Sequence, residues 1–343
     1  MGMQKRLLAI AFLLMVCLLA LPNIDYDSQF RLHVATDFPF RMEYVHSQTF
    51  LPVYQFLLAI ADSITALRIV SIGCVLISAI FIDKIMQVFC EKKVAQRVAA
   101  LFLFNPLILL YGSLAMSESL ATLIAIATIY LYVRDHYKAS AVALTLGVLT
   151  SYWIWVFTPF FLLKGMKEKK FKYVWFTYPI VAIVAWGIIN YTFGQSPIHF
   201  VDMTQTIYQE LAPKISLDAI EQTSMFLFVF PMAFTLGVFL FSCKAMLHSF
   251  KNRMHNRLQT VLVYFAILYT ALLSLGTYFG FIFAWGRYFI PLIPTFLMLG
   301  APAMLATETR HRRILIAAYF SVALIATVIE AWRIMSFQRT MGQ

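Results

Sequence analysis

Long apolar runs follow one another along almost the whole of this 343-residue sequence, and they constrain its fold more than any other feature. Each run is about long enough for a helix to cross a hydrocarbon layer roughly 30 Å thick. Residues of the types AVILMFWYC make up 61% of the chain and charged residues 13%, and the mean hydropathy is +0.78. No polar stretch is large enough to fold separately as a soluble domain. The sequence therefore predicts an all-α polytopic membrane protein with a single transmembrane domain over residues 1–343.

Ending each apolar run at its charged flank predicts about eleven transmembrane helices, with the segment 50–62 left outside this set. Counting 50–62 as a further span would invert every later loop and place the basic sequences EKKVAQR and KGMKEKKFK outside. We therefore interpret it as an interfacial or re-entrant juxtamembrane helix on the outer face. The first run also resembles a secretory signal peptide, and we interpret it as an uncleaved helix. The predicted spans are 6–22, 67–88, 98–112, 118–133, 139–151, 152–163, 173–193, 223–245, 258–281, 288–306 and 314–335.

Basic residues set the predicted orientation, because Lys and Arg are retained on the cytoplasmic side of short loops. With the N-terminus in the cytoplasm, 20 of the 27 basic and 5 of the 16 acidic residues lie inside, which gives +15 inside and −4 outside. The basic balance is therefore a topology signal and does not indicate nucleic-acid binding. We expect a multi-pass protein of the cytoplasmic membrane in a prokaryote, or of the endoplasmic reticulum in a eukaryote.

Under this topology, the polar residues that suggest chemistry gather on the outer face. Ionisable groups close to hydrocarbon are costly, so they mark candidate functional sites. We expect a site there for a charged or hydroxylated substrate. The candidates in the first outer loop, within DYDSQFRLHVATD, are Asp25, Asp27, Arg31, His33 and Asp37. Shorter outer turns add Glu118 in YGSLAMSES, Tyr152 in TSYWIW and Arg287 in FAWGRYFIP.

Several motifs, taken in order, resemble the integral-membrane GT-C glycosyltransferases. The branch they resemble includes the PIG-V-type mannosyltransferase of GPI synthesis, the protein O-mannosyltransferases and the aminoarabinose transferases. The resemblance implies a GT-C-like module over 1–165 with a catalytic outer loop at 23–66, followed by a variable helical half over 166–343 with an outer loop at 194–222. The motifs are YDSQFRLHVA, TFLPVYQFLLAI, ALRIVSIG, FNPLILLYGSLAMSESLATLIAIATIYLY and, late in the chain, GRYFIPLIP.

The resemblance implies an enzyme that moves a sugar, mannose or another hexose or pentose, from a polyprenyl-phosphate carrier to a lipid, glycan or protein acceptor on the outer face. Asp27 in YDSQF matches the family's catalytic base. Glu118 matches an acid that supports the site or, together with Asp27, holds a divalent cation such as Mg²⁺ or Mn²⁺. Arg287 matches an arginine that contacts the lipid phosphate. Direct displacement by one activated acceptor would invert the anomeric carbon.

The sequence departs from the family at one position that matters for phosphate binding. Many relatives carry an arginine after the fifth span, where this chain has LTSYW. Neutralising the phosphate would then depend on Arg287 together with Arg31, Arg41 or Arg68. The residues left for acceptor binding or for support of the site are Asp25, His33, Asp37 and Tyr152.

Simpler structural roles remain open for the same residues. The first two aspartates of the outer loop are also suited to cap a helix that begins near Ser28. Glu118 is suited to the first turn of a helix, where the helix dipole favours an acid. Arg68 and Arg287 are suited to anchor helix ends. The loop 194–222 is either an amphipathic cover for the site or a connector.

Two other functions compete with glycosyl transfer. A transporter or lipid-linked sugar flippase would commonly contain two related halves and broken helices at the membrane midplane, whereas the polar residues here concentrate on one face and no half-to-half repeat is visible. A polysaccharide polymerase or ligase would use a diphosphate-linked donor. The seven basic residues predicted outside favour a donor with a single phosphate.

Overall fold

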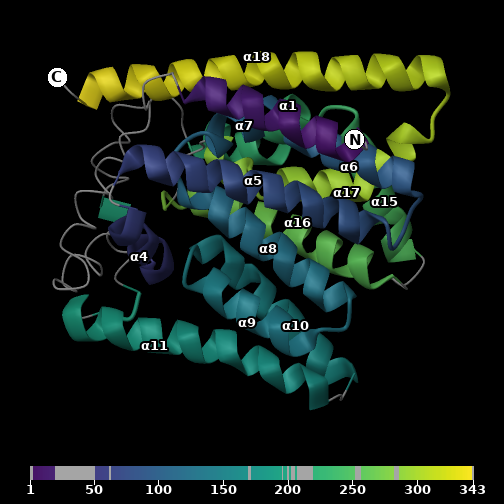
Figure 1. Cartoon of the computed structure of the whole chain (residues 1–343). Helices are drawn as coiled ribbons and strands as arrows, with labels where there is room; N and C mark the ends of the chain where they lie inside the picture. The colour runs from purple at the N-terminus through teal and green to yellow at the C-terminus, as the bar shows by residue number, and fades with distance from the viewer. Residues whose placement is uncertain are drawn as a thin grey trace.

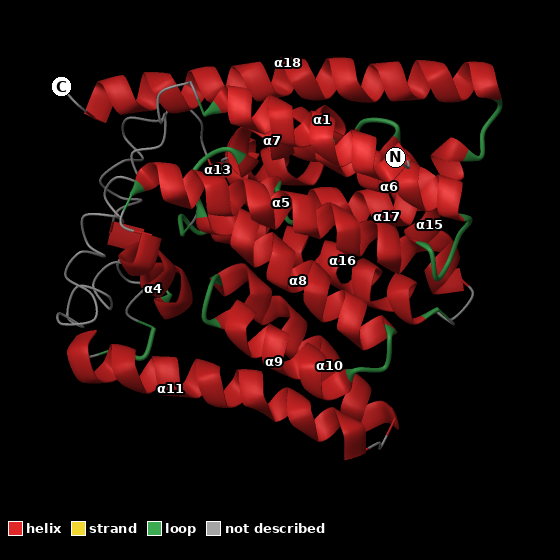
Figure 2. Cartoon of the chain, viewed as in Figure 1, coloured by secondary structure: helices red, strands yellow, loops and turns green. Residues whose placement is uncertain are grey.

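The computed structural model describes residues 3–19, 51–61, 63–168, 171–194, 196–198, 201, 205–206, 219–251, 256–281 and 286–341. Within these ranges the regular secondary structure is helical and contains no strand (Figure 2). The α-helices are α1 (Met3–Leu18), α4 (Pro52–Ala61), α5 (Ile64–Met86), α6 (Lys92–Leu103), α7 (Pro106–Gly112), α8 (Ser117–Val133), α9 (Tyr137–Val148), α10 (Phe157–Glu168), α11 (Thr177–Gly194), α13 (Ala219–Ser224), α14 (Phe230–Thr235), α15 (Val238–Lys251), α16 (Arg257–Tyr278), α17 (Leu292–Leu305) and α18 (Thr309–Met341). Shorter 3-10 or π segments are η1 (Tyr152–Val156), η2 (Phe171–Phe176), η4 (Met225–Val229) and η5 (Gly286–Phe289).

The helices form one bundle in which α18 lies along one side and α11 along the opposite side (Figure 1). Between them, α5 packs against α6 and α8, and α15 packs against α17. Helix α17 also packs against α6, so helices from both sides of residue 165 share one core. Two ends of the bundle matter below. The α4 end is where α4, the start of α5 and the ends of α1 and α7 meet, and the Asp135 end contains the α8–α9 turn and the start of α16.

Each of the eleven predicted spans contains helix, but the structure does not show eleven membrane crossings. In the described ranges, four helices are long and apolar enough to cross a membrane, or up to six if two bent helix pairs each count as one span. The helices in the other five predicted spans are shorter: α1, α8, α9, α10 and α17 have 16, 17, 12, 12 and 14 residues. The polytopic helical class is therefore supported, and α4 occupies the predicted juxtamembrane segment 50–62.

The bend between α6 and α7 has a local cause in the sequence. The two helices meet at an angle of 59°, at the dipeptide Asn105–Pro106. Proline disfavours helical backbone in the residue before it and cannot donate a hydrogen bond. The Asn105 side chain instead accepts hydrogen bonds from the backbone N–H groups of Leu107 and Ile108, at 3.0 and 3.3 Å. Its amide also donates to the Tyr319 hydroxyl at 2.8 Å, which ties the bend to α18.

The sharper break, 119° between α14 and α15, falls at Gly237, whose φ of +54° lies in the left-handed region that favours glycine. Immediately after it, α15 packs closely on α17 at Gly300. A Cβ at Gly300 would overlap with the carbonyl oxygen of Val238 and the hydroxyl of Ser242. The Ser242 hydroxyl in turn donates to the carbonyl oxygen of Phe296 at 2.8 Å. The absence of a side chain at Gly300 therefore permits this helix contact.

We expect Gly300→Val to push α15 and α17 apart and to lower the stability by about 1 to 3 kcal/mol or more, the usual cost of overpacking a close contact. The measurement is thermal unfolding of the purified protein in detergent. Gly73→Ala, in the middle of α5, is the matched control because nothing lies within 4 Å of the added Cβ. An unchanged unfolding temperature for Gly300→Val would contradict the close packing.

Candidate functional site

At the α4 end, the buried arginine Arg68 joins the start of α5 to the ends of two other helices. Arg68 has only 6% of its surface exposed. Its Nε donates to the carbonyl oxygen of Ser113 at 2.6 Å, and its Nη atoms donate to those of Leu18 and Leu19 at 2.7 and 3.3 Å. The last carbonyls of a helix have no partner within that helix. Arg68 therefore closes the end of α1 and fixes the turn that follows α7.

That turn leads directly into α8 and places Glu118 in the first turn of the helix. From the other side, the Tyr54 hydroxyl of α4 donates to the carbonyl oxygen of Ala115 at 2.6 Å. Glu118 is 6% exposed and accepts a hydrogen bond from the Ser117 hydroxyl at 3.3 Å. The positive end of the helix dipole favours a carboxylate at this position. A buried acid thus lies at a helix start whose preceding turn is held by side chains from α4 and α5.

Arg287 reaches the same end of the bundle on η5. Its Nη2 donates to the Tyr288 hydroxyl at 3.1 Å, and its guanidinium carbon lies 5.0 Å from the centre of the Tyr288 ring. The hydroxyl of Tyr269, in α16, donates to the carbonyl oxygen of Tyr288 at 2.8 Å. Helix α16 also packs against α8, the helix that carries Glu118 in its first turn. Helix α16 therefore connects the helix that holds the candidate acid with the segment that carries the candidate arginine.

On the other side of η5 lies Glu330, a buried carboxylate of α18 that is 2% exposed. It accepts hydrogen bonds from the backbone N–H of Gly286 at 2.5 Å and from the Tyr111 hydroxyl at 3.3 Å. It also forms a 3.1 Å ion pair with Arg333. A Cβ at Gly286 would lie 3.0 Å from the Glu330 carboxyl group. Glu330 therefore fixes the backbone immediately before Arg287, and its charge acts on Arg287 as well.

We call Glu118, Tyr269, Arg287, Tyr288 and Glu330 the polar cluster. Its members come from α8, α16, η5 and α18, four elements spread over more than 200 residues of sequence. It combines two buried acids with an arginine that is half-buried. Arg287 is the cationic member of the cluster and the one able to form charge-assisted hydrogen bonds with an anionic group.

Sequence reasoning did not select Glu330 as a site residue. The available signal was a single acid inside the apolar run VALIATVIEAWRIM, three residues before Arg333. An acid and an arginine at that spacing share a helix face and could be interpreted as a surface pair. Only the fold shows that this face of α18 is turned toward η5.

Tyr152 lies at the same end but belongs to a different contact. Its hydroxyl accepts a hydrogen bond from the Trp186 indole at 3.2 Å, and its ring packs edge-on against Trp155 at 5.2 Å. The nearby backbone N–H of Val53 donates to the carbonyl oxygen of Leu149 at 3.0 Å, which joins α4 to the end of α9. The contacts of Tyr152 therefore connect η1 with α11, and its predicted role in acceptor binding stays a prediction.

The remaining candidates, Asp25, Asp27, Arg31, His33 and Asp37, lie outside the described residues, as do Arg41 and most of the loop 194–222. Among the residues that the structure describes, no group of three or more His, Cys, Asp or Glu side chains is arranged to hold a metal ion. The predicted Mg²⁺ or Mn²⁺ site depends on Asp27 with Glu118 and stays a prediction.

Together, the fold and its polar cluster define a helical membrane protein with buried charged residues, among them Arg68, Glu118 and Glu330. Comparison of the sequence with protein-family models and with curated proteins finds no match. Among solved structures, the chain is similar to the Archaeoglobus fulgidus oligosaccharyltransferase in complex with Zn and sulfate, with a TM-score of 0.59 and 12% identity over 95% of this chain and 53% of the other.

Two further structures of an A. fulgidus oligosaccharyltransferase are similar at 11% identity. One is tethered to an acceptor peptide containing the NVT sequon, with a TM-score of 0.56 over 96% of this chain and 55% of the other. The other, named AglB, is in complex with an inhibitory peptide and a dolichol-phosphate, with a TM-score of 0.55 over 96% of this chain and 56% of the other. The chain spans about half the length of these structures and shares their helical fold over that part.

We expect Arg68→Met to destabilise the protein by about 3 kcal/mol, because it leaves buried carbonyl oxygens without a donor in a site that excludes water. The measurement is again thermal unfolding in detergent. Lys84→Met removes the same type of charge from an exposed position of the same helix and should have little effect. Equal effects of the two substitutions would contradict the role of Arg68 in joining the ends of α1 and α7.

Proposed function

We propose that this chain is a GT-C-like glycosyltransferase that transfers a sugar from a polyprenyl-phosphate carrier to a lipid, glycan or protein acceptor. The observation that carries the proposal is that the fold brings Glu118 and Arg287 to the same end of the bundle, where α16 packs against α8 and hydrogen-bonds η5, although 168 positions separate the two residues in the sequence. Both residues are taken from motifs that resemble the GT-C family. The similarity of fold to an oligosaccharyltransferase supports the same class of reaction.

The chemical nature of the donor is supported by a second observation. One of the similar structures contains a dolichol-phosphate, which is a polyprenol-type lipid with a phosphate head, and another contains an acceptor peptide. An apolar helical bundle with an arginine at its α4 end suits a donor whose tail is lipid and whose head is anionic. By the predicted topology, the α4 end faces outward, so transfer takes place on the outer or luminal side.

The proposed reaction is a direct displacement at the anomeric carbon. The acceptor hydroxyl attacks that carbon, its proton passes to the carboxylate of Asp27, and the bond between the anomeric carbon and the phosphate oxygen breaks. The leaving polyprenyl phosphate takes the bond electrons. Arg287 stabilises the negative charge on it, because a guanidinium matches phosphate oxygens in geometry and charge. One displacement inverts the anomeric configuration.

Within this proposal, the described residues have separate roles. Arg287 binds the donor phosphate, and Glu118 supports the site or, with Asp27, holds a divalent cation. We assign Arg68 a structural role, the joining of helix ends, because its N–H groups donate to backbone carbonyl oxygens. Glu330 and Tyr269 act as positioning residues, since each hydrogen-bonds the backbone of η5 beside Arg287.

The test of function is transfer of a labelled sugar from a purified polyprenyl-phosphate donor by the purified protein. We expect turnover with wild type and a loss of about 100-fold or more in Asp27→Asn, the scale of a missing general base. Glu308→Gln, which changes an exposed acid at the Asp135 end to its amide in the same way, is the control and should retain activity. Movement of the lipid-linked sugar across vesicles without chemical change would instead favour a flippase, and transfer only from a diphosphate-linked donor would favour a polymerase or ligase.

The positioning role of Glu330 has its own test in the same assay. We expect Glu330→Ala to reduce kcat/KM for the donor by up to about 100-fold, because displacement of a binding group by about 1 Å is this costly. Glu330→Gln should retain more activity, since an amide oxygen can still accept from the Gly286 N–H. Glu308→Gln, whose side chain is 83% exposed at the Asp135 end, is the control. Wild-type kinetics in Glu330→Ala would refute the role.

A further inference from the structure

A groove runs along α9 at the Asp135 end, away from the polar cluster. Its volume is about 770 Å³. One end is polar and the rest is apolar, so the groove is amphipathic along its length. The lining residues are Asp135, His136, Tyr137, Lys138, Ala139, Val142, Ala143, Leu146 and Trp175.

The apolar part of the groove is a stripe on one face of α9. Ala139, Val142, Ala143 and Leu146 recur at spacings of three and four residues, which places them on the same side of a helix. Val142 and Leu146 are 44% and 48% exposed. A stripe of this kind offers a hydrocarbon chain a continuous apolar surface about two helical turns long.

The polar end of the groove contains an exposed cation next to an aromatic ring. Lys138 lies in the first turn of α9, and its Nζ lies 5.1 Å from the centre of the Trp175 ring on η2. The neighbouring His136 is exposed as well. Tryptophan and lysine are the residues that anchor helices at the boundary between lipid tails and headgroups. The groove therefore changes from apolar to cationic within one turn of helix.

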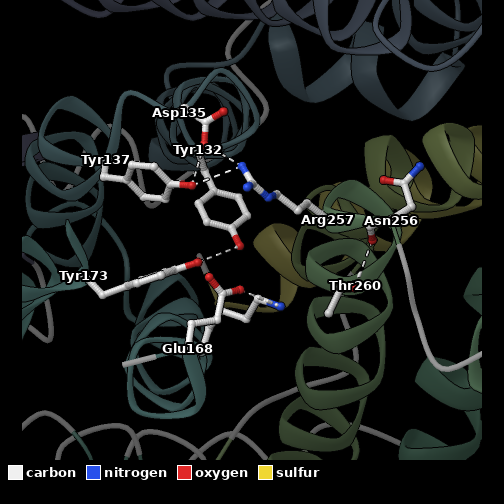
Figure 3. Close-up of polar contacts among 9 residues, drawn as sticks. Tyr132, Asp135, Tyr137, Glu168, Tyr173, Asn256, Arg257 and Thr260 are labelled. Atoms are coloured by element: carbon white, nitrogen blue, oxygen red, sulfur yellow. Dashed lines mark hydrogen bonds and ion pairs between the residues drawn. The ribbon is translucent and has the colours of Figure 1, made fainter. Parts of the chain in front are cut away.

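Asp135, the acidic residue at this end of the groove, forms an ion pair with Arg257 (Figure 3). The Asp135 carboxylate accepts from Arg257 at 2.5 Å and from the Tyr137 hydroxyl at 2.6 Å, and Arg257 also donates to that hydroxyl at 3.1 Å. Asp135 itself has a φ of +62° and forms the α8–α9 turn. These contacts join α8, α9 and α16. Because Asp135 pairs with Arg257, the charge of Lys138 remains available to an anionic ligand.

We propose that this groove binds one anionic glycerophospholipid of the cytoplasmic leaflet. Its phosphate lies against Lys138, and one acyl chain lies along the α9 stripe. Charge complementarity supports this occupant, since the predicted topology places a net +15 on this side of the membrane. The site does not depend on the proposed transferase activity, because it lies at the opposite end of the bundle from the polar cluster.

The test compares phosphatidylglycerol with phosphatidylcholine of identical acyl chains, each added to purified protein in detergent and counted by native mass spectrometry. We expect wild type to retain one phosphatidylglycerol in preference to phosphatidylcholine. Lys138→Gln should weaken retention of phosphatidylglycerol about fivefold, the share of one lysine at an anionic lipid surface. Ala139→Phe, at an exposed position of the stripe, should weaken retention of both lipids by filling the groove.

Lys164→Gln is the matched control. It removes the same charge at the same end of the bundle, but Lys164 pairs with Glu168 at 3.1 Å and does not line the groove. Retention close to that of wild type is expected. The proposal is overturned if both lysine variants weaken retention equally, since general charge would then explain it, or if wild type does not distinguish the two lipids.

Discussion

Buried helix ends in an apolar bundle require hydrogen-bond partners from the protein, because the surroundings supply little water. The α4 end of this chain is organised by that requirement. Arg68 donates to carbonyl oxygens at the end of α1 and in the turn before α8, and Tyr54 donates to a second carbonyl oxygen of that turn. These contacts fix the turn before α8 and therefore the position of Glu118. Leaving such carbonyls unpaired would cost free energy at each group. The geometry of the candidate site therefore depends on the hydrogen bonds of Arg68 and Tyr54.

The same principle continues across the bundle to η5. Two side chains from different helices, Tyr269 and Glu330, hydrogen-bond the backbone of this short segment. Arg287 is thereby held next to the backbone that Glu330 fixes. A guanidinium kept in place before substrate arrives loses little conformational freedom when a phosphate binds. The opposite end of the bundle has a different character, with an ion pair at its surface and an amphipathic groove suited to membrane lipid.

Much of the helical architecture could be predicted from the sequence, because an apolar run of sufficient length leaves few other structures available. Each predicted span contains helix, and the segment 50–62 contains the separate helix α4. The number of crossings could not be predicted in the same way. The backbone bends at Asn105–Pro106 and at Gly237, and α9 and α17 end early. A hydropathy average taken over many residues does not detect such bends and helix ends.

The candidate site was predictable only in part. Glu118 and Arg287 stand out as charges beside apolar runs, and the structure places them at one end through the packing of α16 against α8 and its hydrogen bond to η5. Glu330 was missed because its significance depends on which face of α18 meets η5, and periodicity alone does not determine that. The buried role of Arg68 likewise depends on the position of the α1 end, which comes from tertiary packing.

The central claim is that the polar cluster receives a lipid-linked phosphate. Its most direct test is photocrosslinking of the purified protein with a polyprenyl phosphate that carries a photoreactive group near its head, followed by peptide mapping. We predict adducts at η5 and at the start of α8, displaced by unmodified polyprenyl phosphate and reduced in Arg287→Gln. Adducts confined to the Asp135 end, or adducts at η5 that unmodified polyprenyl phosphate does not displace, would contradict the claim.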